Sequence, residues 1–530
     1  MPSGNQKSFM REAVILTMAA IFVKILSAIY RVPYQNIVGD IGFYIYQQVY
    51  PLYGIAVALS TYGFPIIISK LVAEKEEDHL HVERIARLSF TMISVLGVLL
   101  FSIIFFGANT IAKYMGDMGL TPMIRLVAFS FLLMPFLTVW RGAFQGIGDM
   151  APTAVSQVVE QLIRVGGILL FSYLMIDQGY SLYVAGAGAM AGSLAGSLAG
   201  MFVLFFFIRK RYSTTKLGWP KKNGFHKREI RLLIVQGTAI CLSSMMLVLL
   251  QLVDSFHLYS GLLQAGLSDV EAKIAKGIYD RGQPLLQLGT VAAVSLSLTL
   301  VPLVTSAFQK NQQQEVREYM QLAVKISITI GLAATVGLIN IMDAVNTMLF
   351  ENSEGSFVLS IFCVSILFSS VILTFSGILQ SIDKDIIPAL AVVIGVFVKY
   401  IGNILLVPLY GTAGAAISTV LALCVITIFL AFCIRGQLKI PLIHTTFLYK
   451  ALFSVTVMTV ALQIWRVVME YLLFSNEMDR LQMTVLALSS VAIGACVFIY
   501  TMMKVNLFTE EEWLQIPFGD KLKRISHKIK

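Results

Sequence analysis

Residues 181–208 read SLYVAGAGAMAGSLAGSLAGMFVLFFFI, and the residues that follow, 209–231, read RKRYSTTKLGWPKKNGFHKREIR. The first stretch has no charged residue and exceeds the about 20 residues that an α-helix needs to cross about 30 Å of hydrocarbon. The second stretch carries nine Lys and Arg residues. An uncharged run that ends in a basic loop predicts a membrane-spanning helix with that loop in the cytoplasm.

The rest of the chain repeats this pattern. Of 530 residues, 57% are hydrophobic and 13% are charged, whereas a soluble domain has about 25% charged residues. The apolar runs are long, while a β-barrel would show short alternating segments. We therefore predict an all-α integral membrane protein. Its fourteen expected spans are about 13–33, 42–69, 86–108, 122–142, 152–176, 181–208, 230–258, 282–308, 321–343, 356–382, 386–408, 411–434, 447–473 and 481–504.

Basic residues concentrate in the N-terminus, the even-numbered loops and the C-terminal tail. Under the positive-inside rule, both termini are expected in the cytoplasm. This topology accounts for the net charge of +10 better than nucleic-acid binding does, so we expect no nucleic-acid partner. The basic tail is expected to contact anionic lipid.

Two halves of the chain resemble each other. FPIIIS at 64–69 corresponds to VPLVTS at 301–306, and a Gln-x-Ile segment precedes Pro152 in one half and Pro388 in the other. Six helices per copy is an even number, so the copies share one orientation, with a pseudo-twofold axis along the membrane normal and a cavity between two lobes. The expected divisions are an N-lobe at 1–208, a linker at 209–229, a C-lobe at 230–435, two added spans within 436–504 and a tail at 505–530.

Two basic residues fall inside the first predicted span. An ionisable group at membrane depth costs a few kcal/mol, so it needs a partner or a wet cavity. Lys24 and Arg31 are seven residues apart, about two helical turns, and project from one face. With no acid nearby on that helix, they favour an anionic ligand. The alternative for Arg31 is snorkelling to the outer interface.

Two more arginines have an acid one turn away. Glu160 precedes Arg164 and Glu470 follows Arg466, each by four residues. Each pair is able to neutralise itself on its own helix. We favour this for Arg466, whereas for Arg164 substrate binding remains an equal alternative because its span lies in the repeat.

The C-lobe contains the isolated opposite charges Asp254 and Lys399, with Asn403 four residues after the lysine. We expect an ion pair between the two. It is either structural or a coupling element, since protonation of the Asp or binding of a cation would change its strength. The sequence has no GxxxxGK[ST] motif and no cysteine or histidine in metal-ligand spacing, so we expect neither ATP hydrolysis nor a metal or other cofactor.

The segments FVKILSAIYRVPYQNIVGD at 22–40 and GFYIYQQVYPLYGIAVALSTYGFPIIISKLVAE at 42–74 carry a family resemblance. They resemble the polysaccharide-biosynthesis branch of the multidrug/oligosaccharidyl-lipid/polysaccharide exporter superfamily. Within it, the chain is most similar to stage V sporulation protein B and YabM-type members, and more distantly to the MurJ lipid II flippases. The resemblance covers essentially the whole chain. It implies two six-helix lobes around a central cavity, with alternating access.

The resemblance also implies roles for individual residues. The MurJ cavity is cationic, with essential arginines in the first span and at a YxDR-like start of the eighth. Lys24 and Arg31 stand near the former, and Tyr279–Asp280–Arg281 matches the latter. Asp40 resembles an acid used near the outer gate, and Asp280 would act there too.

The chain departs from the MurJ pattern in two places. Tyr50, Tyr53 and Tyr62 occupy the region of a span-two arginine, and Lys399 replaces a neutral ligand of a sodium site. A fixed ammonium would stand in for the cation, so coupling to protons or to membrane potential is as well supported as coupling to sodium.

The expected function is a flippase for an undecaprenyl-linked sugar, either peptidoglycan lipid II or another envelope polysaccharide unit. Tyr50 and Tyr53 would stack on sugar rings, as would Tyr44 and Tyr46 unless these two belong to an interfacial belt. We expect a monomer in the bacterial cytoplasmic membrane with a cell-wall or sporulation role, and a transporter and not an enzyme. The alternatives are a multidrug/cation antiporter of the same superfamily and, less favoured, a membrane glycan polymerase or ligase.

Overall fold

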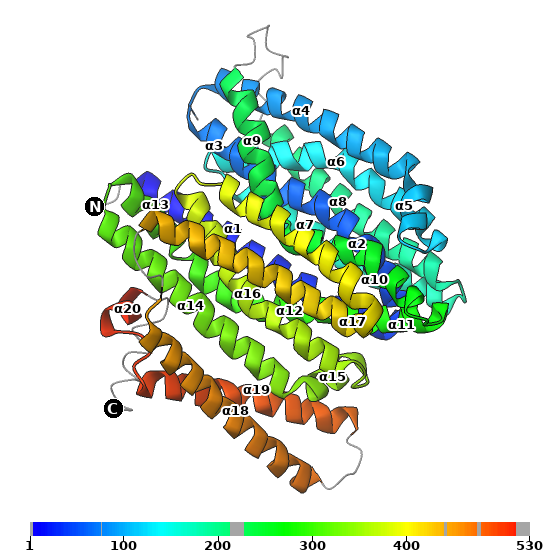
Figure 1. Cartoon of the computed structure of the whole chain (residues 1–530). Helices are drawn as coiled ribbons and strands as arrows, with labels where there is room; N and C mark the ends of the chain where they lie inside the picture. Colours follow the sequence, from blue (N-terminus) through cyan, green and yellow to red (C-terminus); the bar gives the residue numbers. More distant parts are fainter. Residues whose placement is uncertain (1–3, 76, 212–226, 439–442, 474–478, 516–530) are drawn as a thin grey trace. The chain divides into compact units, whose positions relative to one another are not determined.

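The computed structural model describes residues 4–75, 77–211, 227–438, 443–473 and 479–515. These residues form helices joined by short loops, without a strand among them (Figure 1). The predicted all-α class is confirmed. Most of the predicted linker and of the C-terminal tail lies outside the described residues.

The chain divides into two compact units, Met1–Asp280 and Arg281–Lys530. The first contains α1 (Gly4–Ile29), α2 (Arg31–Ala58), the π-helix η1 (Leu59–Gly63), α3 (Phe64–Ala73), α4 (His79–Phe106), α5 (Ala108–Tyr114), the short helix η2 (Met118–Leu120), α6 (Thr121–Gly146), α7 (Ala151–Asp177), α8 (Leu182–Arg211), α9 (Lys227–Ser244), α10 (Met246–Gln264) and α11 (Asp269–Asp280). The second contains α12 (Gly282–Leu298), α13 (Val301–Gln309), α14 (Gln313–Asn340), α15 (Met342–Phe350), α16 (Ser356–Ser381), α17 (Ile386–Leu438), α18 (Thr445–Leu473), α19 (Arg480–Lys504) and α20 (Glu510–Gln515).

The division at Asp280 lies well beyond the basic linker. Helices α9, α10 and α11, which the sequence analysis assigned to the C-lobe, pack in the first unit against α2 and α3. The division into an N-lobe and a C-lobe stays a prediction.

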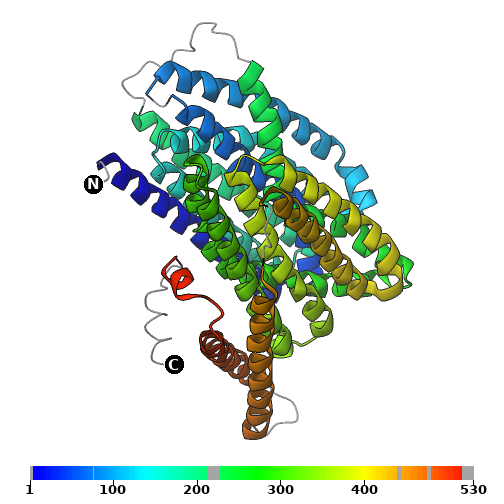
Figure 2. The same cartoon turned by 60° about the vertical axis from the view of Figure 1, so that its left-hand side comes forward.

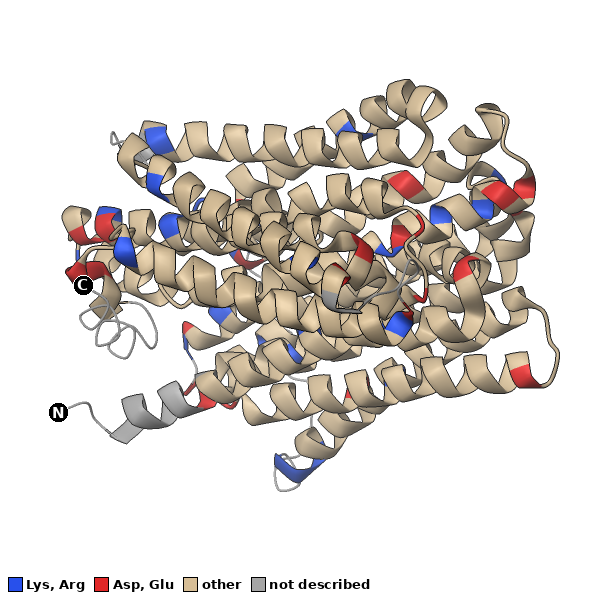
Figure 3. Cartoon of the chain, turned by 90° about the horizontal axis from the view of Figure 1, so that it is seen from below, with Lys and Arg blue, Asp and Glu red and all other residues tan. Residues whose placement is uncertain are grey.

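Twelve segments of the described chain are long and apolar enough to cross a membrane. Two of them contain a break in the helix, where Gly39 has φ 67° and Gly411 has φ 56°. Divided at these glycines, the segments correspond one to one to the fourteen predicted spans. Lys and Arg in blue and Asp and Glu in red are sparse against the tan of all other residues (Figure 3).

The first predicted span ends too early. α1 ends at Ile29 and α2 begins at Arg31, so Pro33 lies in the first turn of α2, where its missing N–H is tolerated. Helical chain then continues in α2 to Gly39, whose left-handed φ turns the chain back. A residue without a Cβ takes up this conformation without strain.

The two copies of the repeat have the same local structure. In the first unit, η1 interrupts the second span, and α3 begins at Phe64 with a proline in its first turn. In the second unit, the eighth span breaks after Leu298, and α13 begins at Val301, again with a proline in its first turn. The matched sequence segments therefore mark matched helix breaks.

Helix α7 packs closely on α8, as the glycine stripe of residues 186–200 predicts. A Cβ on Gly192 would lie 2.5 Å from the backbone carbon of Gly167, and one on Gly196 would lie 2.7 Å from the Cβ of Arg164. The stripe brings the two backbones together and places α8 beside the polar side chains of α7.

This packing predicts a difference between two glycine substitutions. Gly192→Ala should lower the free energy of unfolding by about 1–3 kcal/mol, because the added methyl overlaps the α7 backbone. Gly166→Ala is the matched control, since nothing lies within 4 Å of its added Cβ and alanine favours helix. Thermal unfolding of the purified protein in detergent measures both. Equal melting temperatures would contradict the close approach.

Helices α18 and α19 form a pair in the second unit (Figures 1 and 2). They pack on α14 and α15. On α18, Arg466 Nε lies 2.8 Å from Glu470 Oε1, so the predicted pairing of these residues on their own helix is confirmed. Arg466 also lies 3.7 Å from Asp343.

Candidate functional site

Five tyrosines of the first two spans form a buried group, which we call the tyrosine cluster. Because the chain turns back at Gly39, residues on either side of the turn meet. The rings of Tyr34 and Tyr46 are 4.8 Å apart, and Tyr46 Oη lies 2.8 Å from Tyr30 Oη. The second-span members follow a helical spacing that places them on one face. The cluster consists of Tyr30, Tyr34, Tyr46, Tyr50 and Tyr53.

Arg31 lies against this cluster and is fully buried. Its guanidinium carbon is 4.5 Å from the centroid of the Tyr50 ring, within the range of a cation–π interaction. None of its three nitrogens has a hydrogen-bond partner among the described residues of the first unit. A buried guanidinium with unused donors carries a desolvation penalty. It is therefore suited to a ligand that supplies oxygen acceptors.

Arg164 of α7 reaches the same cluster from another helix. Its guanidinium carbon lies 5.4 Å from the Tyr30 ring centroid and 5.3 Å from that of Tyr53. Nη2 makes two long contacts of 3.4 Å, to Ser27 Oγ and Tyr30 Oη. Its Nε has no partner among the described residues of this unit. Arg31, Arg164 and the tyrosine cluster together form what we call the arginine–tyrosine site.

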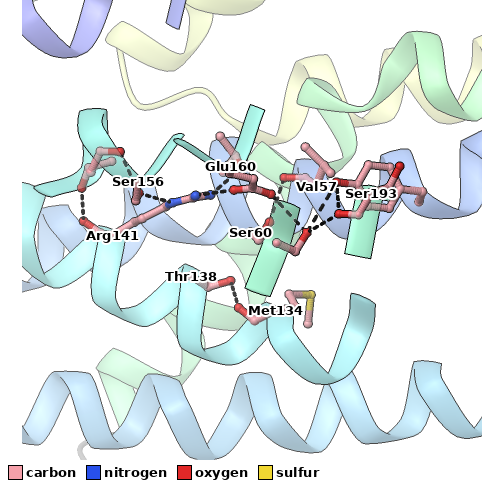
Figure 4. Close-up of polar contacts among 12 residues, drawn as sticks. Val57, Ser60, Met134, Thr138, Arg141, Ser156, Glu160 and Ser193 are labelled. Atoms are coloured by element: carbon pink, nitrogen blue, oxygen red, sulfur yellow. Dashed lines mark hydrogen bonds and ion pairs between the residues drawn. The ribbon is translucent and has the colours of Figure 1, made fainter. Parts of the chain in front are cut away.

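Glu160 does not pair with Arg164, although the two are one turn apart on α7. Instead, Glu160 Oε2 accepts from Arg141 Nη2 of α6 at 2.5 Å (Figure 4). Its other oxygen accepts from Ser197 of α8 at 3.2 Å. Arg141 is fully buried and also donates to Ser156. Self-neutralisation of Arg164 on its own helix is therefore wrong for this structure.

Lys24 lies on α1 and is exposed, unlike Arg31. Its Nζ is 6.0 Å from the centroid of the Tyr62 ring. Both basic residues of the first span thus approach tyrosines of the second span, Lys24 at Tyr62 and Arg31 at Tyr50.

Tyr44 and Tyr46 are fully buried. The hydroxyl of Tyr44 donates to Asp117 at 3.2 Å, and that of Tyr46 bonds to Tyr30. Belt tyrosines face the headgroup region with an accessible hydroxyl, so the belt alternative is wrong for both.

The two residues expected at the gate, Asp40 and Asp280, both belong to the first unit. Asp40 accepts from Gln35 Nε2 at 3.0 Å. A Cβ on Gly277 of α11 would lie 2.2 Å from the Asp40 carbonyl oxygen, so α11 packs directly on the turn that follows the first span. Asp280, at the end of α11, forms a fully buried ion pair with Lys276 at 2.8 Å.

Arg281 begins the second unit and is held there by two amides. Its Nη1 donates to Asn352 at 2.7 Å and to Asn346 at 3.3 Å, and its guanidinium carbon lies 5.4 Å from the Phe350 ring centroid. Because it belongs to the second unit, its expected place beside Arg31 stays a prediction.

Lys399 is buried inside α17 and surrounded by oxygen atoms. Its Nζ donates to Thr419 Oγ1 at 2.7 Å, to Ala415 O at 2.9 Å and to Ser418 Oγ at 3.0 Å. Ser418 in turn donates to Asn403 Oδ1 at 2.5 Å. In the first unit, Asp254 accepts from Tyr279 at 2.9 Å. Since Asp254 and Lys399 belong to different units, their pairing stays a prediction.

That pairing is tested by a double substitution. Asp254→Ala should reduce activity more than Asp254→Ala combined with Lys399→Ala, because the single change leaves a buried ammonium without its counter-charge. Transport by each purified variant, normalised to the folded protein, measures this. Equal losses would argue against the pair.

Two buried ion pairs, Arg141–Glu160 and Lys276–Asp280, were not predicted from the sequence. Arg141 stands one residue before the predicted end of its span, and Lys276 falls in the predicted loop at 259–281. A charge at a span end or in a loop is typical of a solvated residue. The presence of Glu160 as an acid at membrane depth was the available signal for a partner such as Arg141.

Residues 9–308 match the family model described as "Polysaccharide biosynthesis protein". The chain is 42% identical to the uncharacterized membrane protein YabM of Bacillus subtilis (strain 168), over 97% of this chain and 96% of that protein. It is 25% identical to the lipid II flippase MurJ of the same organism, over 93% and 94% of the two chains.

Solved structures share the fold at low sequence identity. An inward-facing multidrug resistance MATE transporter has a TM-score of 0.63, with 17% identity over 78% of this chain and 94% of that chain. The lipid II flippase MurJ in an inward closed conformation has a TM-score of 0.60, with 17% identity over 93% of this chain and 99% of the other.

Proposed function

This chain belongs to the polysaccharide biosynthesis protein family, and from that premise we propose that it flips an undecaprenyl-linked sugar across the bacterial cytoplasmic membrane by alternating access. The family is part of a superfamily of flippases and transporters, not of enzymes. The proposed cargo is peptidoglycan lipid II or another envelope polysaccharide unit on the same lipid carrier.

The unpaired guanidinium of Arg31 carries this proposal. A diphosphate-sugar headgroup cannot enter hydrocarbon unaided, because its charges lose their hydration there. Guanidinium groups form short, charge-assisted hydrogen bonds with phosphate oxygens. Arg31 and Arg164 offer donors that the protein itself leaves unused, and the neighbouring tyrosine rings suit the sugar.

The charge of the site argues against the antiporter alternative. A multidrug/cation antiporter binds organic cations and needs net acidic charge in its site. The arginine–tyrosine site has two buried arginines, and Glu160, the acid one turn from Arg164 on α7, is already paired with Arg141. The shared MATE-like fold does not decide between these functions, because one fold hosts many activities.

The proposal is tested by lipid II translocation in liposomes. Purified protein is reconstituted with fluorescent lipid II, and a membrane-impermeant reagent reports how much headgroup has changed leaflet. We expect transport by the wild type over empty liposomes, and competition by excess undecaprenyl diphosphate. An organic cation such as ethidium should not compete. Absence of lipid II movement would reject lipid II as cargo, and ethidium transport in its place would support the antiporter.

We also propose that both termini are cytoplasmic, that no cofactor is required, and that the protein acts as a monomer.

The driving force of transport is identified in the same liposomes by imposing a proton gradient, a sodium gradient or a membrane potential separately. The oxygen atoms around Lys399 support a fixed ammonium in place of a bound cation, so we expect the sodium gradient to have no effect.

A further inference from the structure

Three arginines in the described part of the first unit are buried, and they differ in their hydrogen bonds. Arg141 has a partner at each nitrogen: Nε donates to Ser156 at 3.2 Å, Nη1 to Thr61 at 3.0 Å and Nη2 to Glu160 at 2.5 Å. Arg31 has none within the described first unit, and Arg164 has only long contacts. One arginine is therefore fully bonded by the protein, and two remain available at the tyrosine cluster.

Glu160 lies close enough along the helix to pair with Arg164 and so to neutralise one of the two available arginines. It lies one turn before Arg164 on α7, and acid–arginine pairs at this spacing normally meet on a helix surface. Helix α8 packs against the same two residues, since a Cβ on Gly196 would lie 2.7 Å from both the Glu160 carbonyl oxygen and the Arg164 Cβ. The carboxylate is instead directed toward Arg141, where the Ser197 hydroxyl holds its second oxygen.

Arg141 is itself held in this position from two sides. Ser156, which lies one turn before Glu160 on α7, and Thr61 of η1 both accept from its guanidinium. The direction in which Glu160 points is thus determined by residues that do not touch the tyrosine cluster.

We infer that Arg141 is a positioning residue that keeps Glu160 away from Arg164, so that Arg31 and Arg164 together present two free positive charges to a diphosphate. This inference rests on the proposed function, and it names diphosphate as the ligand chemistry of the same site. Without Arg141, Glu160 pairs with Arg164 and the site keeps only Arg31 as a free cation. Arg141 therefore acts through Arg164 and does not contact the ligand.

Binding of undecaprenyl diphosphate to the full chain in lipid nanodiscs tests this. We expect Arg141→Gln to weaken binding about tenfold or more, as the loss of one charged hydrogen-bonding group requires. Glu160→Gln should bind at least as tightly as wild type, because Arg164 stays free. The double variant Arg141→Gln/Glu160→Gln should regain wild-type affinity, and Arg141→Lys should retain most of it.

Two further variants separate positioning from simple support of the fold. In an Arg164→Gln background, Arg141→Gln should cause no additional loss of affinity. Arg84→Gln removes another ion pair of the same unit, with Glu229 at 3.0 Å, and should leave binding unchanged. Melting temperatures and size-exclusion profiles identify variants that fail to fold. If Arg141→Gln does not fold, the affinity of Glu160→Gln for undecaprenyl diphosphate still tests the inference, because only a structural ion pair predicts that it falls.

If the Arg141–Glu160 pair only supports the fold, the two single variants should have equal effects. Glu160→Gln would then weaken binding as much as Arg141→Gln, and that result would overturn the inference. Competition with inorganic pyrophosphate shows whether the headgroup is recognised; failure to displace the lipid would assign binding to its tail and also overturn the inference. Tight, asymmetric binding without lipid II movement would reject lipid II as the cargo and leave the inference standing. A wild type that does not bind the diphosphate would reject both.

Discussion

Arg31→Gln is expected to abolish transport while leaving the protein at least as stable as the wild type. In the structure the Arg31 guanidinium is fully buried, yet no described residue of the first unit accepts a hydrogen bond from it. Removing it deletes no hydrogen bond within that unit, and the relieved desolvation of a charge offsets the lost cation–π contact with Tyr50. The ligand, in contrast, loses its hydrogen bonds to a guanidinium, and we expect the transport rate to fall about 100-fold or more as a result.

The measurement combines lipid II movement in liposomes with thermal unfolding in detergent. Arg141→Gln serves as the stability control, because it removes an arginine that is equally buried but bonded at every nitrogen; its melting temperature should fall clearly. Lys24→Ala and Arg281→Ala should also stop transport if the cationic cavity includes them. Normal transport in all three cavity variants would remove the cationic model. A large drop in the melting temperature of Arg31→Gln would assign Arg31 to the fold instead.

Lys276→Met is expected to be the most destabilising single change in α11. The Lys276–Asp280 pair is 2.8 Å long, and both side chains are essentially inaccessible. Removing one partner of a buried pair leaves an uncompensated charge, which lowers the free energy of unfolding by about 3–5 kcal/mol. A second change, Asp280→Asn, removes that charge and should restore most of the loss.

Lys273→Met on the same helix is the matched control. Lys273 pairs with Asp269 at 2.8 Å, but the Asp269 side chain is 60% exposed. Lys273 also lies 3.9 Å from the buried Asp117, which keeps hydrogen bonds from Tyr44 and Tyr183 when the lysine is removed. An ion pair open to solvent contributes about 1 kcal/mol or less. Thermal unfolding of the three proteins should therefore rank Lys273→Met near the wild type, the double variant slightly lower and Lys276→Met lowest. Equal melting temperatures for the two lysine variants would show that burial of Lys276 contributes nothing.

The membrane-spanning helices were predictable from the sequence. Each predicted span has a counterpart in the structure, because a helix that crosses hydrocarbon needs about 20 apolar residues regardless of its neighbours. The helix breaks at η1 and at the start of α13 were not predicted; the repeat matched the two sequence segments, and only the structure shows that a new helix begins in each. The end of the first span was missed, because a proline or a glycine can each end a helix, and only the backbone shows that the chain turns at Gly39 and not at Pro33.

The candidate site was predictable only as a set of charges. Lys24, Arg31, Arg164 and Glu160 stand out in the sequence because ionisable residues are rare in apolar runs. The partners of these residues cannot be recognised in the sequence, because they depend on which helices pack together. In the sequence, Arg164 lies one helical turn from Glu160. In the structure, α6 and α8 pack on α7, and Glu160 forms its ion pair with Arg141 of α6 and accepts a hydrogen bond from Ser197 of α8.

The sequence alone thus determined that this protein is a helical membrane protein with basic residues at membrane depth, because hydropathy and charge can be followed along the chain without knowing how its helices pack. Only the tertiary structure decided which of those residues remain available to a ligand. A guanidinium is satisfied by acceptors within about 3 Å, and such neighbours come from helices far apart in the chain. Arg141 is satisfied in this way by η1 and α7, and Arg31 is not.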